Sequence, residues 1–283
     1  MVNKKIWLGA AVTVATTIAV GTTVINHVKA DTDDKTVTVG IVGDSSRELW
    51  ENVSKRTEKK YGVKIKIKVF SDYVKLNQAL VDGSLDLNAF QTKVFFDDQN
   101  KKLGNKLGNK LVSIGKTVIS PIRLYSLKHD KLADLKDGAQ VVIPNDATNE
   151  QRALNLLVQA KLIKYNESVD TPTVKDITDN PKKLDIVEIA SDQTVSALKS
   201  ADAAVINGNY AQDAGLKTKN VLLTQDVSNP KTASPYINII VARKDKAKTK
   251  AYREIVKVYQ TKTTEKEINK LYNGFESAAW NLK

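Results

Sequence analysis

The pattern that most constrains this fold is an alternation of strand-like and helix-like segments that occurs twice along the chain. β-branched residues fill positions 36–42, and apolar residues alternate with lysines over 63–70. The alternation begins again at residues 140–144. Chains of this kind form parallel sheets with helices on their faces. The sequence therefore predicts an α/β protein of two lobes, each a mostly parallel sheet flanked by helices.

The other segments extend both rounds of the alternation. The expected strands are residues 36–42, 63–70, 85–90, 112–120, 140–144, 184–189, 203–206 and 236–243. The expected helices are residues 45–57, 71–82, 95–103, 148–162, 192–199, 249–260 and 264–272. Ser45 and Thr148 are each followed three residues later by Glu or Gln, which predicts capping boxes. The repeated KLGNKLGNKL of residues 102–111 predicts a solvated loop.

The N-terminus has the pattern of a targeting segment. Lys4 and Lys5 precede an uncharged run over residues 6–25, and Val-Lys-Ala at 28–30 resembles a cleavage site. The run is also long enough to cross a bilayer of ~30 Å. Residues 1–30 are therefore expected to be a signal peptide or an N-terminal membrane anchor.

The absence of cysteine shapes the prediction about localisation. With no cysteine in the sequence, we expect an exported protein that is not cysteine-lipidated. Its expected place is the outer face of the cytoplasmic membrane or the cell envelope, reached by an uncleaved anchor or after cleavage of the signal peptide.

Composition also argues against catalysis. A chain without cysteine has no thiolate nucleophile and no cysteine-ligated metal, and its histidines are His27 and His129 only. Gly-Lys-Thr at 115–117 lacks the first glycine of a P-loop, because Lys110 stands in its place. We therefore expect no enzyme activity, no metal and no cofactor.

The chain is strongly basic, with a net charge of +12. Removal of residues 1–30 would leave 41 basic against 32 acidic residues, a net +9. Such a charge favours anionic partners. However, the lysines are spread along the chain without interleaved aromatics, which is typical of solvated surfaces. We expect no nucleic-acid partner.

Polar residues follow directly after a buried strand at residues 203–206. Asn207 and Asn209 lie there with Tyr210. Ligands of open α/β sheets bind beyond the carboxyl ends of the strands, and an amide side chain can both donate and accept hydrogen bonds. Asn-Gly is equally common in tight turns, so from the residues alone both interpretations stay open.

Seven stretches in order resemble one family. They are SDYVKLNQAL (71–80), DLNAFQ (86–91), IPND (143–146), NEQRAL (149–154), NPKKL (180–184), AAVINGNYA (203–211) and SPY (234–236). Together they resemble the NlpA-type substrate-binding proteins, whose best-known members bind methionine for an ABC importer. The resemblance covers nearly all of residues 35–283.

This resemblance implies a periplasmic-binding-protein fold with the ligand cleft between two lobes. Lobe 1 would comprise residues 35–121 and 237–283, and lobe 2 residues 122–236. The implied function is that of an extracytoplasmic monomer that delivers an amino acid, first of all methionine, to an ABC permease. The alternatives are a receptor for a different amino acid or a short peptide, and an envelope-surface interaction protein that has lost transport.

The resemblance also implies the ligand-binding residues. Arg152 would hold the α-carboxylate, since a guanidinium can bind a carboxylate through two hydrogen bonds. The other residues expected in the pocket are Asn149, Asn207, Asn209, Tyr73, Phe90 and Gln91. From the residues alone, Arg152 could be an exposed arginine, Phe90 a core residue and Gln91 a cap at a helix start.

Four residues depart from the family pattern. Where the family has F-Q-H-K-P-Y, this chain has Thr92, Val94 and Phe95 in place of His, Pro and Tyr. Arg123 stands where the family often has glycine, and it is expected either to face solvent or to add a charge to the cleft. These departures leave the ligand's side chain open.

Overall fold

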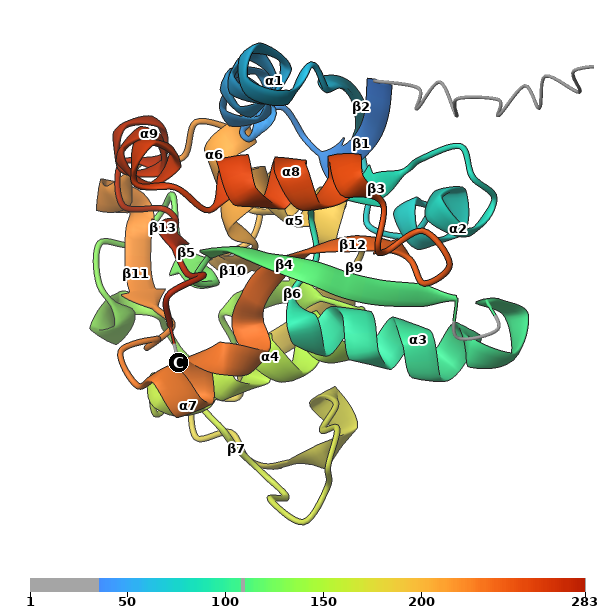
Figure 1. The fold of residues 1–283 in the computed structure, drawn as a ribbon. Coiled ribbons are helices and arrows are strands. Elements are labelled where there is room, and N and C mark those ends of the chain that lie inside the picture. The colour runs from blue at the N-terminus through green and yellow to red at the C-terminus, as the bar shows by residue number, and fades with distance from the viewer. Residues whose placement is uncertain (1–35, 108–109, 283) are drawn as a thin grey trace, which may run out of the picture. The chain divides into compact units, whose positions relative to one another are not determined.

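A computed structural model describes residues 36–107 and 110–282 (Figure 1). The leader predicted at residues 1–30 lies outside these ranges. The described residues form one compact unit, in which the strands assemble into two larger sheets and one small one. No helix within the described ranges has the length and apolar character needed to cross a membrane.

The first sheet has six strands. In spatial order they are β13 (Ser277–Ala278), β4 (Leu111–Ile119), β12 (Ile237–Arg243), β3 (Leu87–Asn88), β1 (Thr36–Val42) and β2 (Lys64–Phe70). The β1 strand pairs in parallel with β2 and β3, whereas β12 is antiparallel to both β3 and β4. The sheet is mixed rather than mostly parallel, because the returning chain inserts β12 between two earlier strands.

The second sheet has five strands. In spatial order they are β11 (Val221–Thr224), β5 (Arg123–Tyr125), β10 (Ala203–Ile206), β6 (Gln140–Pro144) and β9 (Asp185–Ile189). Only the pairs β10–β6 and β6–β9 are parallel. A separate antiparallel pair is formed by β7 (Lys164–Tyr165) and β8 (Ile177–Asp179).

The helices of the described residues are α1 (Arg47–Tyr61), α2 (Leu76–Val81), α3 (Lys93–Leu107), α4 (Ala147–Gln159), α5 (Thr194–Ala197), α6 (Gly208–Asp213), α7 (Pro230–Ala233), α8 (Lys250–Tyr259) and α9 (Lys262–Tyr272). All of them overlap predicted helices except α6 and α7, which the sequence analysis did not predict. Short 3₁₀ turns occur at Leu132–Asp134, Val174–Asp176, Ser191–Gln193, Thr218–Asn220 and Ser234–Tyr236. The α/β fold class is thus confirmed.

Both predicted capping boxes are wrong. Ser46, which precedes α1, makes no capping hydrogen bond through its side chain. The α4 helix begins at Ala147, one residue before Thr148, because the carboxylate of Asp146 caps it by accepting the backbone N–H of Asn149. Aspartate is among the strongest N-cap residues, and here it determines where the helix starts.

Two other predicted boundaries also differ. The helix expected over residues 71–82 begins only at Leu76, because Val74 N–H donates to Asp72 Oδ1 in a local turn that competes with helix. The predicted loop over 102–111 is helical as far as Leu107, since α3 continues into it.

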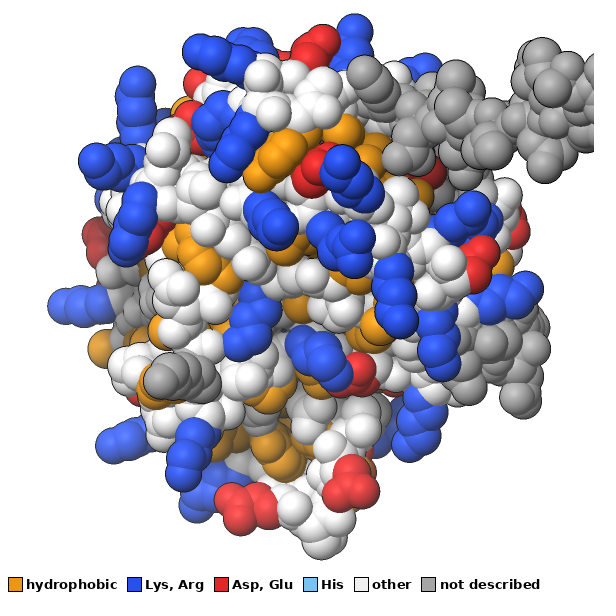
Figure 2. Space-filling model, in the orientation of Figure 1, with side chains coloured by type: hydrophobic (Ala, Val, Ile, Leu, Met, Phe, Trp, Pro, Cys, Tyr) orange, Lys and Arg blue, Asp and Glu red, His pale blue; other side chains and the backbone are white. Residues whose placement is uncertain are grey.

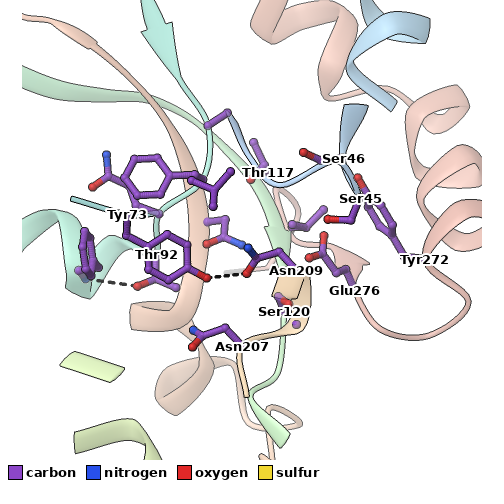
Figure 3. Close-up of a pocket in the computed structure, with 18 of the residues that line it drawn as sticks. Ser45, Ser46, Tyr73, Thr92, Thr117, Ser120, Asn207, Asn209, Tyr272 and Glu276 are labelled. Carbon is purple, nitrogen blue, oxygen red and sulfur yellow. Dashed lines mark hydrogen bonds between the residues drawn. The ribbon is translucent and has the colours of Figure 1, made fainter. Parts of the chain in front are cut away.

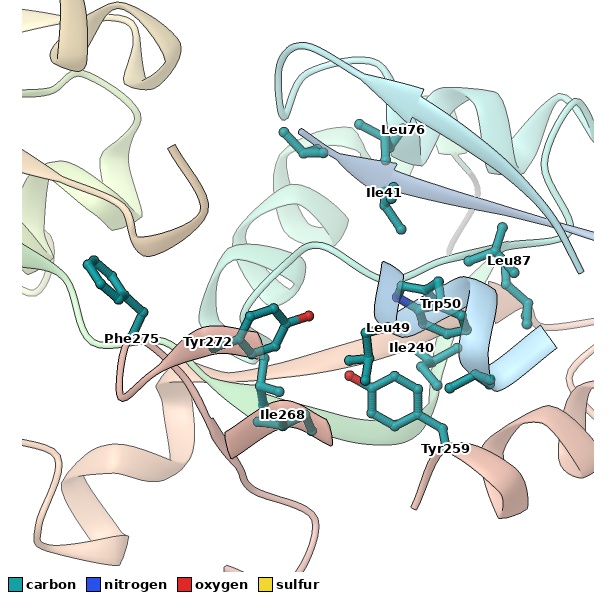
Figure 4. Close-up of a cluster of buried hydrophobic side chains, with 14 of the residues drawn as sticks. Ile41, Leu49, Trp50, Leu76, Leu87, Ile240, Tyr259, Ile268, Tyr272 and Phe275 are labelled. Carbon is teal, nitrogen blue, oxygen red and sulfur yellow. The ribbon is translucent and has the colours of Figure 1, made fainter. Parts of the chain in front are cut away.

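The main core packs on the first sheet and extends to Val142 and Ile206 of the second sheet. The Trp50 ring of α1 lies tilted by 40° against the Tyr259 ring of α8, with ring centroids 5.0 Å apart, and α1 also packs against α9 (Figure 4). A second cluster, around Leu154 and Leu157, joins α4 to the second sheet. The strands of the two sheets fall within the predicted lobe ranges, while the division at residues 121 and 237 stays a prediction.

Positive side chains are scattered over the face drawn in Figure 2, with acidic ones among them. This distribution is what solvated lysines produce.

Candidate functional site

One pocket in the described part of the chain is lined by strands of the first sheet and by α4 and α6, which belong to the part of the chain that builds the second sheet. Its empty volume, counted together with the open solvent at its mouth, is about 780 Å³. All seven residues predicted to bind ligand line it, namely Tyr73, Phe90, Gln91, Asn149, Arg152, Asn207 and Asn209. Figure 3 shows Tyr73, Asn207 and Asn209 among them. The structure brings the seven together from four separate segments of the chain.

Arg152 is a buried cation on α4, with 3 % of its surface exposed. Its Nε donates to Gln225 Oε1 at 2.7 Å and its Nη2 to the Ser120 carbonyl at 2.6 Å, while its Cζ lies 4.6 Å from the Tyr236 ring centroid. Burial lowers the pKa of Arg152 to about 10. Among the described residues it forms no ion pair. A buried positive charge held only by neutral groups is suited to an anionic ligand.

Two buried amides lie beside this arginine. Asn207 Nδ2 donates to Asn149 Oδ1 at 2.9 Å, and Asn149 Nδ2 donates to the carboxylate of Asp146. These bonds assign the Asn207 side chain an orientation that leaves its Oδ1 buried and unpartnered by any described group. Asn207 therefore offers the pocket an acceptor.

An aromatic wall closes another side of the pocket. The ring of Tyr73 lies 5.8 Å from that of Phe90 and 6.0 Å from that of Phe95, centroid to centroid. The Tyr73 hydroxyl donates to Asn209 Oδ1 at 2.5 Å, and burial raises the pKa of this phenol well above its usual value. The wall combines apolar contact with one fixed amide, whose Nδ2 has no partner among the described residues.

Gln91 contributes differently from the other predicted residues. Its Nε2 donates to Asn77 Oδ1 at 2.7 Å and to Asn88 Oδ1 at 2.9 Å, and its Oε1 accepts from Asn77 Nδ2 at 3.0 Å. All three side chains are buried. Gln91 lines the pocket, but these bonds turn its amide toward the protein.

The family departures occupy distinct places. Thr92 caps α3, because its Oγ1 accepts the backbone N–H of Phe95. Both residues line the pocket, whereas Val94 does not.

Arg123 takes neither of its two expected positions. It is buried, with 7 % of its surface exposed, and does not line the pocket. Its guanidinium donates to the carbonyls of Pro121, Gly274 and Phe275 and lies over the Phe275 ring. The expectation of solvent or cleft is wrong because backbone carbonyls of the C-terminal segment satisfy this cation.

Several pocket residues escaped the sequence analysis. Glu276 follows α9 and lines the pocket together with Ser45, Ser46 and Ser120. Removal from water raises the pKa of Glu276 to about 7, an effect that the nearby Ser120 hydroxyl and Arg123 guanidinium oppose. No motif marks Glu276 in the sequence, so no sequence signal could have identified it.

The pocket can bind a ligand through a charged guanidinium, through amide hydrogen bonds and through apolar contacts. The described residues contain no cluster of three potential metal ligands from His, Asp or Glu.

Comparison with known proteins identifies the family. The model of the family described as NlpA lipoprotein matches residues 37–280. The chain belongs to the NlpA lipoprotein family. The D-methionine-binding lipoprotein MetQ of Salmonella typhi is 39% identical over 252 residues, covering 88% of this chain and 90% of that protein. Outer membrane lipoprotein 3 of Mannheimia haemolytica is 37% identical over 244 residues, covering 86% and 89%.

A solved structure of this family has the same fold. The substrate-binding protein of a methionine transporter from Streptococcus pneumoniae superposes with a TM-score of 0.80 at 36% identity, covering 87% of this chain and 96% of that one. The two-lobed substrate-binding fold implied by the sequence motifs is thereby confirmed.

Family membership corrects the prediction about localisation. The family and both NlpA relatives described above are named as lipoproteins. The prediction that this is not a cysteine-lipidated protein is therefore wrong. That prediction rested only on the absence of cysteine from the sequence. Membership of the NlpA lipoprotein family, in contrast, is shown by the match over residues 37–280.

Proposed function

We propose that this protein is the substrate-binding protein of an ABC importer and that its ligand is methionine. Its relatives are named for methionine binding, and the Streptococcus pneumoniae protein belongs to a methionine transporter. The observation that carries the proposal is the buried guanidinium of Arg152, which has no anionic partner among the described residues and lies in a pocket that also has an aromatic wall. One pocket thus offers contacts for a carboxylate and for an apolar side chain.

The parts of methionine would be divided among these groups. Arg152 would bind the carboxylate, and Asn207 Oδ1 would accept a hydrogen bond from the ammonium group. The thioether would lie among Tyr73, Phe90 and Phe95, where a sulfur–aromatic contact contributes about 0.3–1.5 kcal/mol. All of these contacts bind the ligand without changing it chemically, in agreement with a family of binding proteins rather than enzymes.

The alternatives differ in what they expect of the pocket. Another amino acid or a short peptide would use the same carboxylate contact, and Thr92 and Phe95 alter the wall that would select its side chain. An envelope protein that had lost transport would have no need of unpaired buried polar atoms. Asn207 Oδ1 and Asn209 Nδ2 are both of this kind within the described ranges, which favours a working receptor.

The test is direct identification of the ligand. We expect mass spectrometry of the denatured native protein to release methionine, and calorimetry of the emptied protein to show one-to-one binding of D- or L-methionine, also in excess chelator. Leucine and other neutral amino acids serve as comparison ligands. Absence of binding by both methionine enantiomers would contradict the proposal.

Two partner predictions go with this function. The loaded protein is expected to stimulate ATP hydrolysis by its permease complex, and the protein is expected to be a monomer. Light scattering of the purified protein tests the second point.

A further inference from the structure

The pocket has a polar end that the proposed function leaves unused. Figure 3 shows Glu276, Ser45 and Ser46 on the side away from Tyr73 and Thr92. Glu276 reaches this position because β13, which begins at the next residue, pairs with the end of β4.

Glu276 is a carboxylate without a cationic partner among the described residues. The nearest guanidinium, that of Arg123, is occupied by the carbonyls of residues 121, 274 and 275. The other titratable groups that face Glu276 are Asp213, Tyr259 and Tyr272, and none of them is a cation. Glu276 is partly exposed at the pocket wall, and a carboxylate there with no cation beside it attracts a ligand group of opposite charge.

One further oxygen lies beside this carboxylate. A Cβ on Gly208 would come 2.1 Å from Ser120 Oγ and 4.0 Å from Glu276 Oε1. Glycine at position 208 therefore keeps open a space that both oxygens border. The Ser120 hydroxyl lies close enough to lower the pKa of Glu276, and a hydroxyl that donates to a carboxylate can still accept a hydrogen bond. An ammonium group has three N–H donors and no acceptor, so it matches this pair of acceptors.

We propose that Glu276 is the counter-ion of the ligand's ammonium group. This inference rests on the proposed function and adds a specificity-determining residue to it. The pocket would then recognise both charged groups on the ligand's α-carbon, with Arg152 on the carboxylate and Glu276 on the ammonium. It would discriminate against ligands in which the amine is missing or acylated.

The test compares two ligands and two variants by calorimetry. Glu276→Gln keeps the shape of the side chain and removes its charge. Glu51→Gln, at an exposed position of α1, is the matched control. The ligands are methionine and 4-(methylsulfanyl)butanoate, which is methionine without its amine. A hydrogen bond to a charged group contributes about 1.5–3 kcal/mol, so Glu276→Gln should weaken methionine binding by roughly 10-fold or more. Its affinity for the desamino compound should be unchanged.

A second measurement needs no variant. Wild-type protein should prefer methionine over the desamino compound by roughly 10-fold or more at pH 8, and this preference should shrink as the pH falls to 5.5 and Glu276 is protonated. Asp213 also has a raised pKa. It remains present in Glu276→Gln, so a flat pH profile in that variant assigns the change to Glu276.

The outcomes separate the two proposals. If wild-type protein does not bind methionine, the proposed function fails and this inference fails with it. If it binds methionine but Glu276→Gln weakens both ligands equally, or weakens neither, Glu276 does not pair with the ammonium and only this inference is overturned.

Discussion

Replacement of Arg152 by methionine should affect binding and stability in different ways. The substitution keeps the unbranched stem and removes the charge. Burial lowers the pKa of Arg152 from 12.5 to about 10, which corresponds to about 3 kcal/mol unfavourable to the charged form in the fold, at 1.36 kcal/mol per pKa unit. Removing the charge therefore removes this unfavourable contribution to the folding free energy.

The substitution also removes favourable contacts. Two hydrogen bonds are lost, to Gln225 and to the Ser120 carbonyl, and each acceptor left unsatisfied costs about 1–3 kcal/mol. The two losses together cost about 2–6 kcal/mol against a gain of about 3 kcal/mol, so the unfolding free energy of the empty protein should change by no more than about 3 kcal/mol. Denaturant unfolding measures this quantity.

Binding should be lost much more strongly. A ligand carboxylate would enter the pocket without its cation, which costs on the order of 3 kcal/mol or more. Calorimetry should therefore show affinity reduced by more than about 100-fold. In a melting experiment with ligand at 100 times the wild-type dissociation constant, the wild-type protein gains about 2.7 kcal/mol and the variant about 0.4 kcal/mol or less.

The matched control is Arg253→Met, which removes an exposed arginine from α8 and should leave affinity unchanged. Binding by Arg152→Met within about threefold of wild type, under a difference of roughly 0.7 kcal/mol, would refute the carboxylate assignment.

Three further substitutions test other parts of the structure. Arg123→Leu should lower the unfolding free energy by roughly 2–4 kcal/mol in urea, because buried carbonyls of the C-terminal segment lose their donor; an unchanged midpoint would contradict this. Asn77→Leu should destabilise the protein by roughly 1–3 kcal/mol, since Gln91 loses both a donor and an acceptor, and a stability equal to wild type would count against the amide cluster. Gly208→Ala should weaken methionine binding, because the new Cβ would displace Ser120 Oγ from its 2.1 Å approach; adding Ser120→Ala should restore part of the affinity, and an undiminished affinity of the single variant would disprove the crowding.

Sequence reasoning predicts the long elements well and the short ones poorly. The β-branched run of residues 36–42 forms β1 over the same residues. By contrast, β13 has two residues, and its strand character comes only from pairing with Val118 and Ile119 of β4. Such a pairing depends on tertiary register, which local propensity does not encode.

The candidate site shows the same division. The NEQRAL motif indicates Arg152 and Asn149 by resemblance, and both line the pocket. The direction in which the Gln91 side-chain amide points could not be predicted, because the neighbouring sequence favours neither the ligand side nor the protein side. Asn77 and Asn88, which lie 14 and 3 residues away in sequence, determine that it faces the protein.

Arg123 links these observations. It departs from the family pattern in the sequence, and in the structure it holds the carbonyls of Gly274 and Phe275, the two residues directly before Glu276. Its charge also opposes the rise in the pKa of Glu276. Arg123 in β5 of the second sheet thus holds in place the segment after α9 that carries Glu276, through hydrogen bonds to carbonyls rather than through an ion pair. No sequence motif connects the two residues, because their positions are 153 residues apart in the chain and near each other only in the fold.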